Sequence, residues 1–96
     1  MLILRVLDRG EMHGWGIAEK IAQSSGKDLL VGEGSLYPAL YRMQDKGWIV
    51  SEWSQSDNNR RAKYYRLTKT GRRQLDAEKE NWSRLVTAVA KVMAPA

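Results

Sequence analysis

Two short segments in the second half of this 96-residue chain are rich in aromatic and β-branched residues, and a polar stretch separates them. They are WIVSEW at residues 48–53 and KYYRLT at residues 63–68, and both are typical of β-strands. The stretch between them, SQSDNNRRA, is rich in turn-forming residues, and the turn is expected at Asp57 to Asn59. The pattern predicts one long β-hairpin. Because the remaining segments have helical periodicity, the expected fold class is mostly α with a β-hairpin (α+β).

Three helices are expected before the hairpin. The first covers residues 1–9 and ends at Gly10. Its apolar residues fall on one stripe, made of Leu2, Ile3, Val6 and Leu7. The second runs from about residue 15 to residue 24, after a two-glycine turn at residues 12–16. Residues 29–31 form an apolar run that is either a small strand or an extended connector.

The third helix is expected to begin near Ser35, a good N-terminal cap, and to stop at Gly47. Pro38 is tolerated in a first turn because the amide hydrogen that it lacks would be unpaired there. At about 100° per residue, the buried side comprises Leu36, Ala39, Leu40 and Met43. The outward side carries Tyr37, Pro38, Tyr41, Arg42 and Asp45. Two tyrosines, a proline and an arginine are unusual on a face that only needs to be soluble.

Thr68 or Thr70 is expected to cap a final long helix that runs to about residue 93, with Pro95 as its stop. Its apolar residues form one stripe, made of Leu75, Trp82, Leu85, Val86, Val89, Val92 and Met93. The stripe is larger than a single small domain needs to cover the helix. Such stripes often seal a dimer, so a homodimer through this helix is expected.

The positive charge of the chain is concentrated in one region. The net charge is +5, and seven of the basic residues lie between Gln55 and Leu75, against the single carboxylate of Asp57. A local basic patch is the footprint of a phosphate-binding surface, although a solvated charged face is the alternative. The order of elements matches a winged helix-turn-helix at residues 1–68, followed by a dimerisation helix at residues 69–96, in one continuous folded unit.

Other classes of function find little support in the sequence. The chain has no cysteine, no set of residues suited to catalysis or metal binding and no Gly-rich phosphate loop, so neither an enzyme nor a cofactor is expected. No stretch reaches the ~20 apolar residues that span a bilayer, and a cytosolic protein is the simplest interpretation. The single histidine, His13, is expected to hydrogen-bond nearby backbone rather than to act as a sensor. Three of the four tryptophans are expected in the core or the hairpin packing: Trp15, Trp48 and Trp53.

Three stretches together resemble the PadR-like family of bacterial transcriptional regulators, in its short subfamily with a single C-terminal helix. They are MHGWGIAEKI, EGSLYPALYRMQDKGWI and RRAKYYRLTKTGRRQL, and the likeness runs from Leu2 to about Met93. The resemblance implies a dimer that binds double-stranded DNA at a pseudo-palindromic operator and represses promoters. Dimerisation in the family uses the last helix, packed with the first.

The family's functional positions can be carried over to this chain. DNA-binding positions are Ser35, Tyr37, Pro38, Tyr41 and Arg42 on the third helix and Arg60, Arg61 and Lys63 on the wing, with Tyr65 mainly in the core. The seam between C-terminal helices in the family can admit flat aromatic effectors, which makes Trp82 a candidate effector site beside its plainer role as an interface anchor. A winged helix that binds a partner protein and an RNA-binding variant stay open as alternatives.

Overall fold

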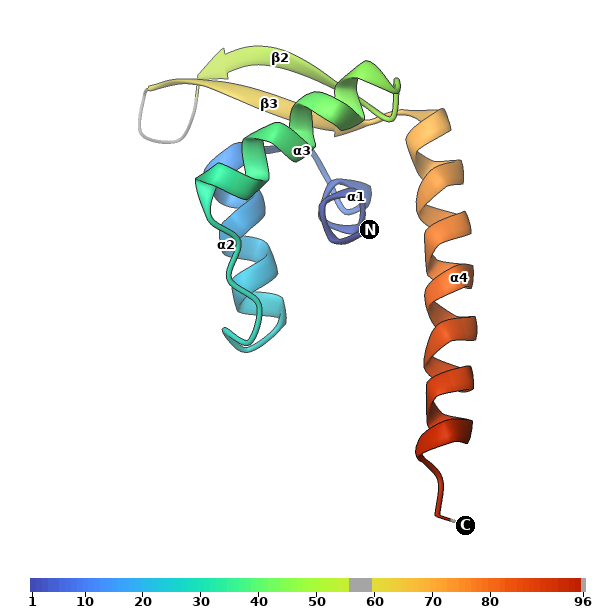
Figure 1. Ribbon diagram of the computed structural model, residues 1–96. Coiled ribbons are helices and arrows are strands. Elements are labelled where there is room, and N and C mark those ends of the chain that lie inside the picture. Colours follow the sequence, from blue (N-terminus) through green and yellow to red (C-terminus); the bar gives the residue numbers. More distant parts are fainter. Residues whose placement is uncertain (56–59, 96) are drawn as a thin grey trace.

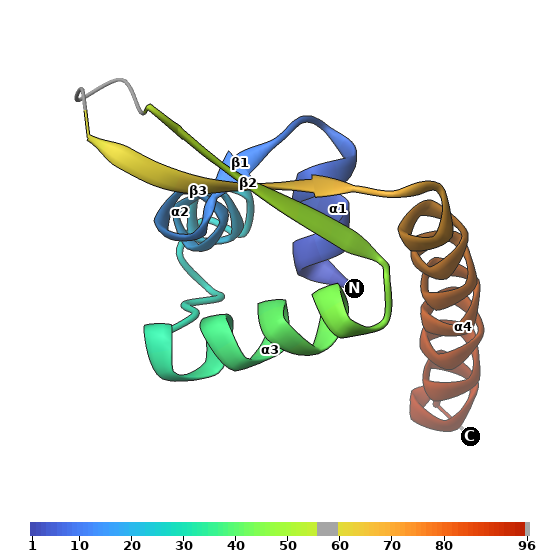
Figure 2. The ribbon, with the colours of Figure 1, turned by 90° about the horizontal axis from the view of Figure 1, so that it is seen from above.

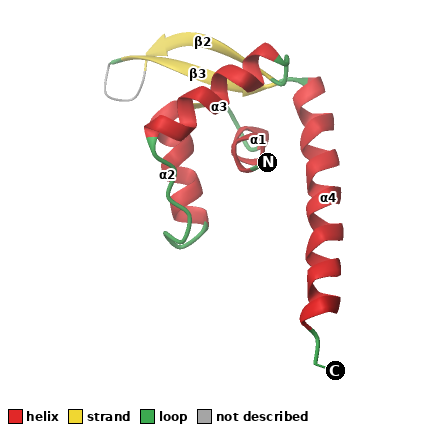
Figure 3. Cartoon of the chain, viewed as in Figure 1, coloured by secondary structure: helices red, strands yellow, loops and turns green. Residues whose placement is uncertain are grey.

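The computed structural model describes residues 1–55 and 60–95, and within them the chain forms four α-helices and three β-strands (Figure 1). The expected turn at Asp57 to Asn59 lies outside the described residues. The elements in chain order are α1 (Leu2–Asp8), β1 (Met12–His13), α2 (Gly14–Ser24), α3 (Glu33–Asp45), β2 (Ile49–Gln55), β3 (Arg61–Leu67) and α4 (Lys69–Met93). The mixed α+β class and the order of the four helices and the hairpin are as predicted (Figure 3).

The sheet has three antiparallel strands in the order β1-β3-β2. Strand β1 is the exception to the predicted order, because residues 12–16 were expected to be only a turn. Met12 pairs with Tyr65 and His13 with Tyr64, so two residues before α2 join the outer side of the hairpin. The sequence does not reveal this strand, because two residues are too few to show the alternation of a strand. Its pairing partners also lie more than 50 positions away in the sequence. Residues 29–31 form no strand and serve as the connector between α2 and α3.

Helix α3 begins earlier than the sequence indicates. Its N-cap is Gly32, and the amides of Ser35 and Leu36 both donate to the Gly32 carbonyl oxygen. Ser35 is therefore inside the first turn and is not the cap. Pro38 consequently lies in the second turn, where its missing N–H leaves the Gly34 carbonyl without its helical donor. Residue 34 is exposed, so this oxygen can be solvated.

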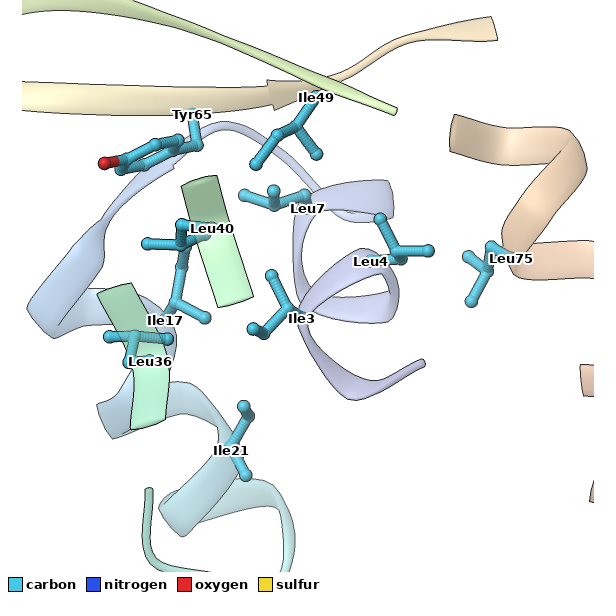
Figure 4. Close-up of a cluster of buried hydrophobic side chains, with 10 residues drawn as sticks. All are labelled: Ile3, Leu4, Leu7, Ile17, Ile21, Leu36, Leu40, Ile49, Tyr65 and Leu75. Atoms are coloured by element: carbon cyan, nitrogen blue, oxygen red, sulfur yellow. The ribbon is translucent and has the colours of Figure 1, made fainter. Parts of the chain in front are cut away.

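The core lies where α1, α2, α3, the sheet and the start of α4 meet (Figure 4). Its buried members are Ile3, Leu4, Leu7, Ile17, Ile21, Leu36, Leu40, Ile49, Tyr65 and Leu75. The expected stripe of α1 is displaced by one position, since Leu4 is fully buried while Leu2 is 41% exposed. The reason is that α1 contacts α2, β3 and α4 together, so a broad face of this short helix is covered.

Helix α4 is fastened to the body by its first two turns. Of the two predicted caps, Thr68 and Thr70, it is Thr68 that caps the helix, by accepting a hydrogen bond from the Gly71 amide. The Thr68 hydroxyl also lies 2.6 Å from the Gly47 carbonyl oxygen. Leu75 is buried and faces Leu4 of α1 (Figure 4). Beyond these turns every described residue from 81 to 95 is exposed. Figures 1 and 2 both place α4 at the end of the molecule that is opposite the point where β2 ends and β3 begins.

Candidate nucleic-acid interface

Four of the five DNA-binding residues predicted on α3 are exposed. Ser35, Pro38, Tyr41 and Arg42 are exposed, with Tyr41 at 59%. Tyr37 is different, because it is half-buried and packs against the core. A Cβ at Gly14 would lie 2.7 Å from the Tyr37 hydroxyl oxygen, so the start of α2 fits closely against this phenol. The expectation that Tyr37 points wholly away from the body was therefore wrong. The absence of a side chain at residue 14 is what lets the ring pack inward.

One face of the β2–β3 hairpin is buried near the body and exposed near the tip. Successive residues alternate between faces, so the pairs Ile49–Leu67, Ser51–Tyr65, Trp53–Lys63 and Gln55–Arg61 share a face. Ile49 and Tyr65 are buried and anchor this inner face, as predicted for Tyr65. The hairpin extends past the core. Consequently the inner-face residues nearer the tip, among them Arg61, face the side on which α3 lies.

A hollow of about 460 Å³ separates α3 from the wing. It is lined by Tyr37 and Tyr41 of α3 and by Arg60, Arg61 and Lys63 of the wing, among other residues. Arg60 and Arg61 are exposed, and Lys63 is half-buried. The structure thus brings five of the eight predicted DNA-binding residues together. The other three, Ser35, Pro38 and Arg42, are exposed on α3 outside the lining of this hollow.

The basic run between residues 55 and 75 does not form one patch. Its second half lies on α4, at the opposite end of the molecule from the start of β3 (Figure 2). Arg72 turns toward α1, where its guanidinium lies 2.7 Å from a carboxylate oxygen of Asp8 in an ion pair. Only the wing part of the run, with Arg60, Arg61 and Lys63, belongs to the hollow.

His13 has the structural role expected for it. Its Nδ1 accepts a hydrogen bond of 3.0 Å from the Gly16 amide and so caps α2. The ring stacks on Trp15 at 3.6 Å between centroids and meets the edge of Tyr64 at 5.2 Å. Since the Nδ1 lone pair is used, the proton of the neutral ring is assigned to Nε2.

Two of the three tryptophans that were expected in the core or the hairpin packing lie outside the core. Trp15 is 52% exposed and Trp53 is 58% exposed, and both line the hollow between α3 and the wing. Neither residue packs in the core, although Trp53 does contact Arg61 within the hairpin. Trp48 is half-buried and packs against the core. Alternation from Ile49 does place Trp53 on the inner face of the wing. The ring is exposed because the hairpin extends beyond the core. The alternation of residues along the strand does not indicate how far the hairpin extends.

Tyr65 connects the buried core with the hollow. Its ring lies over the core, and its hydroxyl points outward from the cluster (Figure 4). Burial raises the pKa of the Tyr65 phenol above its ordinary value, and the neighbouring phenols of Tyr37 and Tyr41 raise that pKa further. Tyr65 therefore stays neutral near pH 7 and can donate a hydrogen bond.

The apolar stripe on α4 is a second candidate surface. Its exposed members are Trp82, Leu85, Val86, Val89, Val92 and Met93. Leu75 was predicted to belong to the same stripe, but it is buried in the core of its own chain. The surface available to a partner therefore starts at Trp82. Contiguous exposed apolar residues on a helix usually mark an interaction surface.

A metal site and a membrane-spanning helix are both absent from the part of the chain that the structure describes. No group of three His, Cys, Asp or Glu residues there could hold a metal ion. Among the same residues, no helix is both long and apolar enough to cross a membrane.

Helices α2 and α3, followed by the β2–β3 wing, define a winged helix-turn-helix protein. Comparison with known proteins agrees. A transcriptional regulator from Clostridium thermocellum is 26% identical, with a TM-score of 0.88 over 97% of this chain and 90% of that chain. A PadR family transcription regulator from Clostridium difficile is 34% identical, with a TM-score of 0.77 over 94% of this chain and 91% of that chain.

Two further matches concern the family and a longer relative. A 37.1 kDa transposon protein of Streptomyces fradiae is 35% identical over 95 residues, and the match covers 99% of this chain but 26% of that protein's length. Residues 3–77 match the transcriptional regulator PadR-like family. The chain therefore belongs to this family, whose members are regulators of transcription, and DNA-binding regulation is the function that membership implies.

Proposed function

We propose that this chain is a transcriptional repressor that binds a pseudo-palindromic DNA operator as a homodimer. The observation that carries the proposal is the hollow between α3 and the wing, because it joins Tyr37 and Tyr41 of α3 to the wing cations Arg60, Arg61 and Lys63. Two elements that differ in chemistry, one polar and aromatic and one cationic, face the same space. Such a surface suits base edges and phosphates on adjacent parts of one duplex.

In this proposal α3 is the recognition helix and enters the major groove. Arg42 is exposed and can donate two parallel hydrogen bonds to guanine, or it can hold a phosphate. The hydroxyls of Ser35 and Tyr37 suit phosphate oxygens. Pro38 offers an apolar surface to a thymine methyl group. Tyr41, which is the more exposed of the two α3 tyrosines, supplies another hydroxyl.

The wing contacts the flanking backbone or the minor groove. Arg60 and Arg61 are long, exposed and always charged, which suits a narrow minor groove or neighbouring phosphates. Lys63 is half-buried and lies closer to the body on the same hairpin. Its ammonium group would act as a point charge on the phosphate nearest to α3.

Residues 69–96 are proposed as the dimerisation element and residues 1–68 as the DNA-binding part of one folded unit. The support is the exposed stripe from Trp82 to Met93, which finds no cover within the described part of its own chain. Burial of Leu75 against α1 fixes the base of the element in the body. A dyad between two such helices would present two α3 helices to half-sites roughly 34 Å apart.

The direct test is a gel shift with the DNA upstream of the gene that encodes this chain. The expected result is a complex that survives excess random DNA, with a size that corresponds to a dimer. Binding that random DNA removes equally would contradict operator recognition. Preference for a transcribed RNA of the same sequence would favour the RNA-binding alternative. Failure to bind any nucleic acid would favour a winged helix that binds a partner protein.

A flat aromatic effector bound at Trp82 is a second proposal, and the half-exposed indole within an apolar stripe supports it. Titration with a planar dye should quench the tryptophan fluorescence of wild type more than that of a variant without Trp82, and it should release the operator DNA. The matched variant is Trp82→Leu, which keeps an apolar side chain in the stripe but lacks the indole. Dye that releases DNA from wild type and from this variant at the same concentration would contradict the site.

A further inference from the structure

Trp53 lies on the wing and does not pack in the core. The residue lies in β2 on the inner face of the hairpin, and 58% of its surface is exposed. A single exposed apolar residue needs no explanation in itself. Here, however, the ring also lines the hollow between α3 and the wing, so it stands on the surface proposed to meet DNA.

Trp53 has a specific partner, Arg61 of β3. In the register of the hairpin, Trp53 is opposite Lys63 and Gln55 is opposite Arg61, so Trp53 and Arg61 are diagonal neighbours on one face. Diagonal neighbours are within reach of each other when the side chains are long or aromatic. The guanidinium carbon of Arg61 lies 5.7 Å from the centroid of the Trp53 ring, within the range of a cation–π contact.

A guanidinium can contact an indole with its flat face and keep its edges free. Its N–H donors lie in the plane of the group and point away from the ring at the edges. Arg61 can therefore stack on Trp53 and donate to a phosphate or a base edge at the same time. An arginine without such support has many rotamers, and binding must order them.

We propose that Trp53 is a positioning residue for DNA binding, which holds the guanidinium of Arg61 over the hollow between α3 and the wing. The inference rests on the proposed DNA-binding function and adds a residue to it. Trp53 acts through Arg61, so its effect on affinity requires Arg61 to be present. An aromatic ring is what the contact needs, so phenylalanine or tyrosine at residue 53 retains part of the effect.

The test is a double-mutant cycle measured by fluorescence anisotropy with a labelled operator. Trp53→Ala and Trp53→Leu are each expected to weaken binding by about two- to fivefold per wing, which is the effect of an exposed cation–π contact. Trp53→Phe retains affinity nearer to wild type. In the background of Arg61→Ala, Trp53→Leu causes no further loss. Ser54→Ala, on the opposite face of the same strand, is the control and leaves affinity unchanged.

Several outcomes would overturn the inference. An equal loss from Trp53→Leu with and without Arg61 would mean that the indole contacts DNA by itself. Tighter binding by Trp53→Leu would mean that the stack withholds Arg61 from DNA. Thermal unfolding of each variant checks that the substitution has not altered the fold. If Arg61→Ala loses affinity and Trp53→Leu does not, only the role of Trp53 is rejected. If wild type itself does not prefer the operator to random DNA, the proposed function is rejected.

Discussion

Gly71, in the first turn of α4, lies directly against the backbone carbonyl of Trp48, the residue that precedes β2. A Cβ at residue 71 would overlap this carbonyl oxygen, and it would also lie 2.8 Å from Cδ1 of Leu67. Glycine at this position therefore permits the close approach of helix and hairpin. The same approach allows Thr68 to cap α4 and to reach the carbonyls of residues 47 and 48.

Gly71→Ala is expected to destabilise the fold by about 1–3 kcal/mol, because the obstacle is backbone, which can move only with its strand. Gly34→Ala is the matched control. It also places alanine in a helix, but nothing lies within 4 Å of its added Cβ, and helix propensity then favours alanine by up to about 1 kcal/mol. Urea unfolding of both variants measures the contrast. Equal stability of the two would contradict the close packing at Gly71.

Removal of the wing arginines should weaken binding to every DNA sequence. Arg60→Ala with Arg61→Ala takes two exposed charges from the hollow, and the salt slope should fall by about 0.9 for each phosphate that is no longer neutralised. Operator titrations between low and moderate salt give the slope. Arg84→Ala on α4 removes a charge away from the wing and serves as the control. A slope in the double variant equal to that of wild type would disprove the role of the wing.

Arg42→Ala should reduce discrimination between operator and random DNA. A bidentate contact to guanine contributes roughly 1–3 kcal/mol of discrimination, so the preference should fall by about fivefold to about 150-fold. Competition titrations with operator and random duplexes measure this ratio. An equal loss on both duplexes would show that Arg42 contacts only a phosphate.

Charges on the α4 stripe should separate the dimer without unfolding the chain. Val86→Glu with Val89→Glu places two carboxylates on residues that are about half-exposed in the single chain, so helix content is retained. Sedimentation is expected to give the mass of a monomer. Lys91→Glu changes a charge on the opposite side of the same helix and should remain a dimer. Dimeric Val86→Glu/Val89→Glu would contradict an interface through this stripe.

Tyr65 should make the fold less stable in alkali. Its pKa is raised in the folded state from the ordinary value of 10.0, so the unfolded chain loses the phenolic proton first. The stabilising contribution is complete below pH 10.0 and is lost as the pH rises through the folded pKa. Wild type should consequently lose stability above pH 10 more steeply than Tyr65→Phe. Parallel curves of unfolding free energy against pH would contradict this.

The features that could be predicted from the sequence depend on local signals. The periodicity of the helices, the Thr68 cap and the aromatic strands of the hairpin lie within short windows, and the structure has each of them. The grouping of Tyr37 and Tyr41 with the wing cations followed from the order of these elements. Tyr65 was expected in the core from the resemblance to the family, and it is 3% exposed.

The features that could not be predicted depend on contacts between distant residues. Strand β1 exists because Met12 and His13 meet β3, and no pattern in two residues reveals such pairing. Helix α3 begins at Glu33 because the Gly32 carbonyl accepts the first helical hydrogen bonds, although Ser35 has the better capping side chain. The exposure of Trp15 and Trp53 depends on where the core ends, which is a property of the assembled layers.

The junction around Thr68 has a mechanical consequence. The Thr68 hydroxyl lies within hydrogen-bonding distance of the carbonyls of Gly47 and Trp48, which follow the last turn of α3, and it also begins α4. Gly47 takes a positive φ of 75° there, which an L side chain rarely adopts. The end of one helix and the start of the other therefore share a single rigid joint. A twist applied along α4 would reach α3 as a change of angle, with no flexible linker to absorb it.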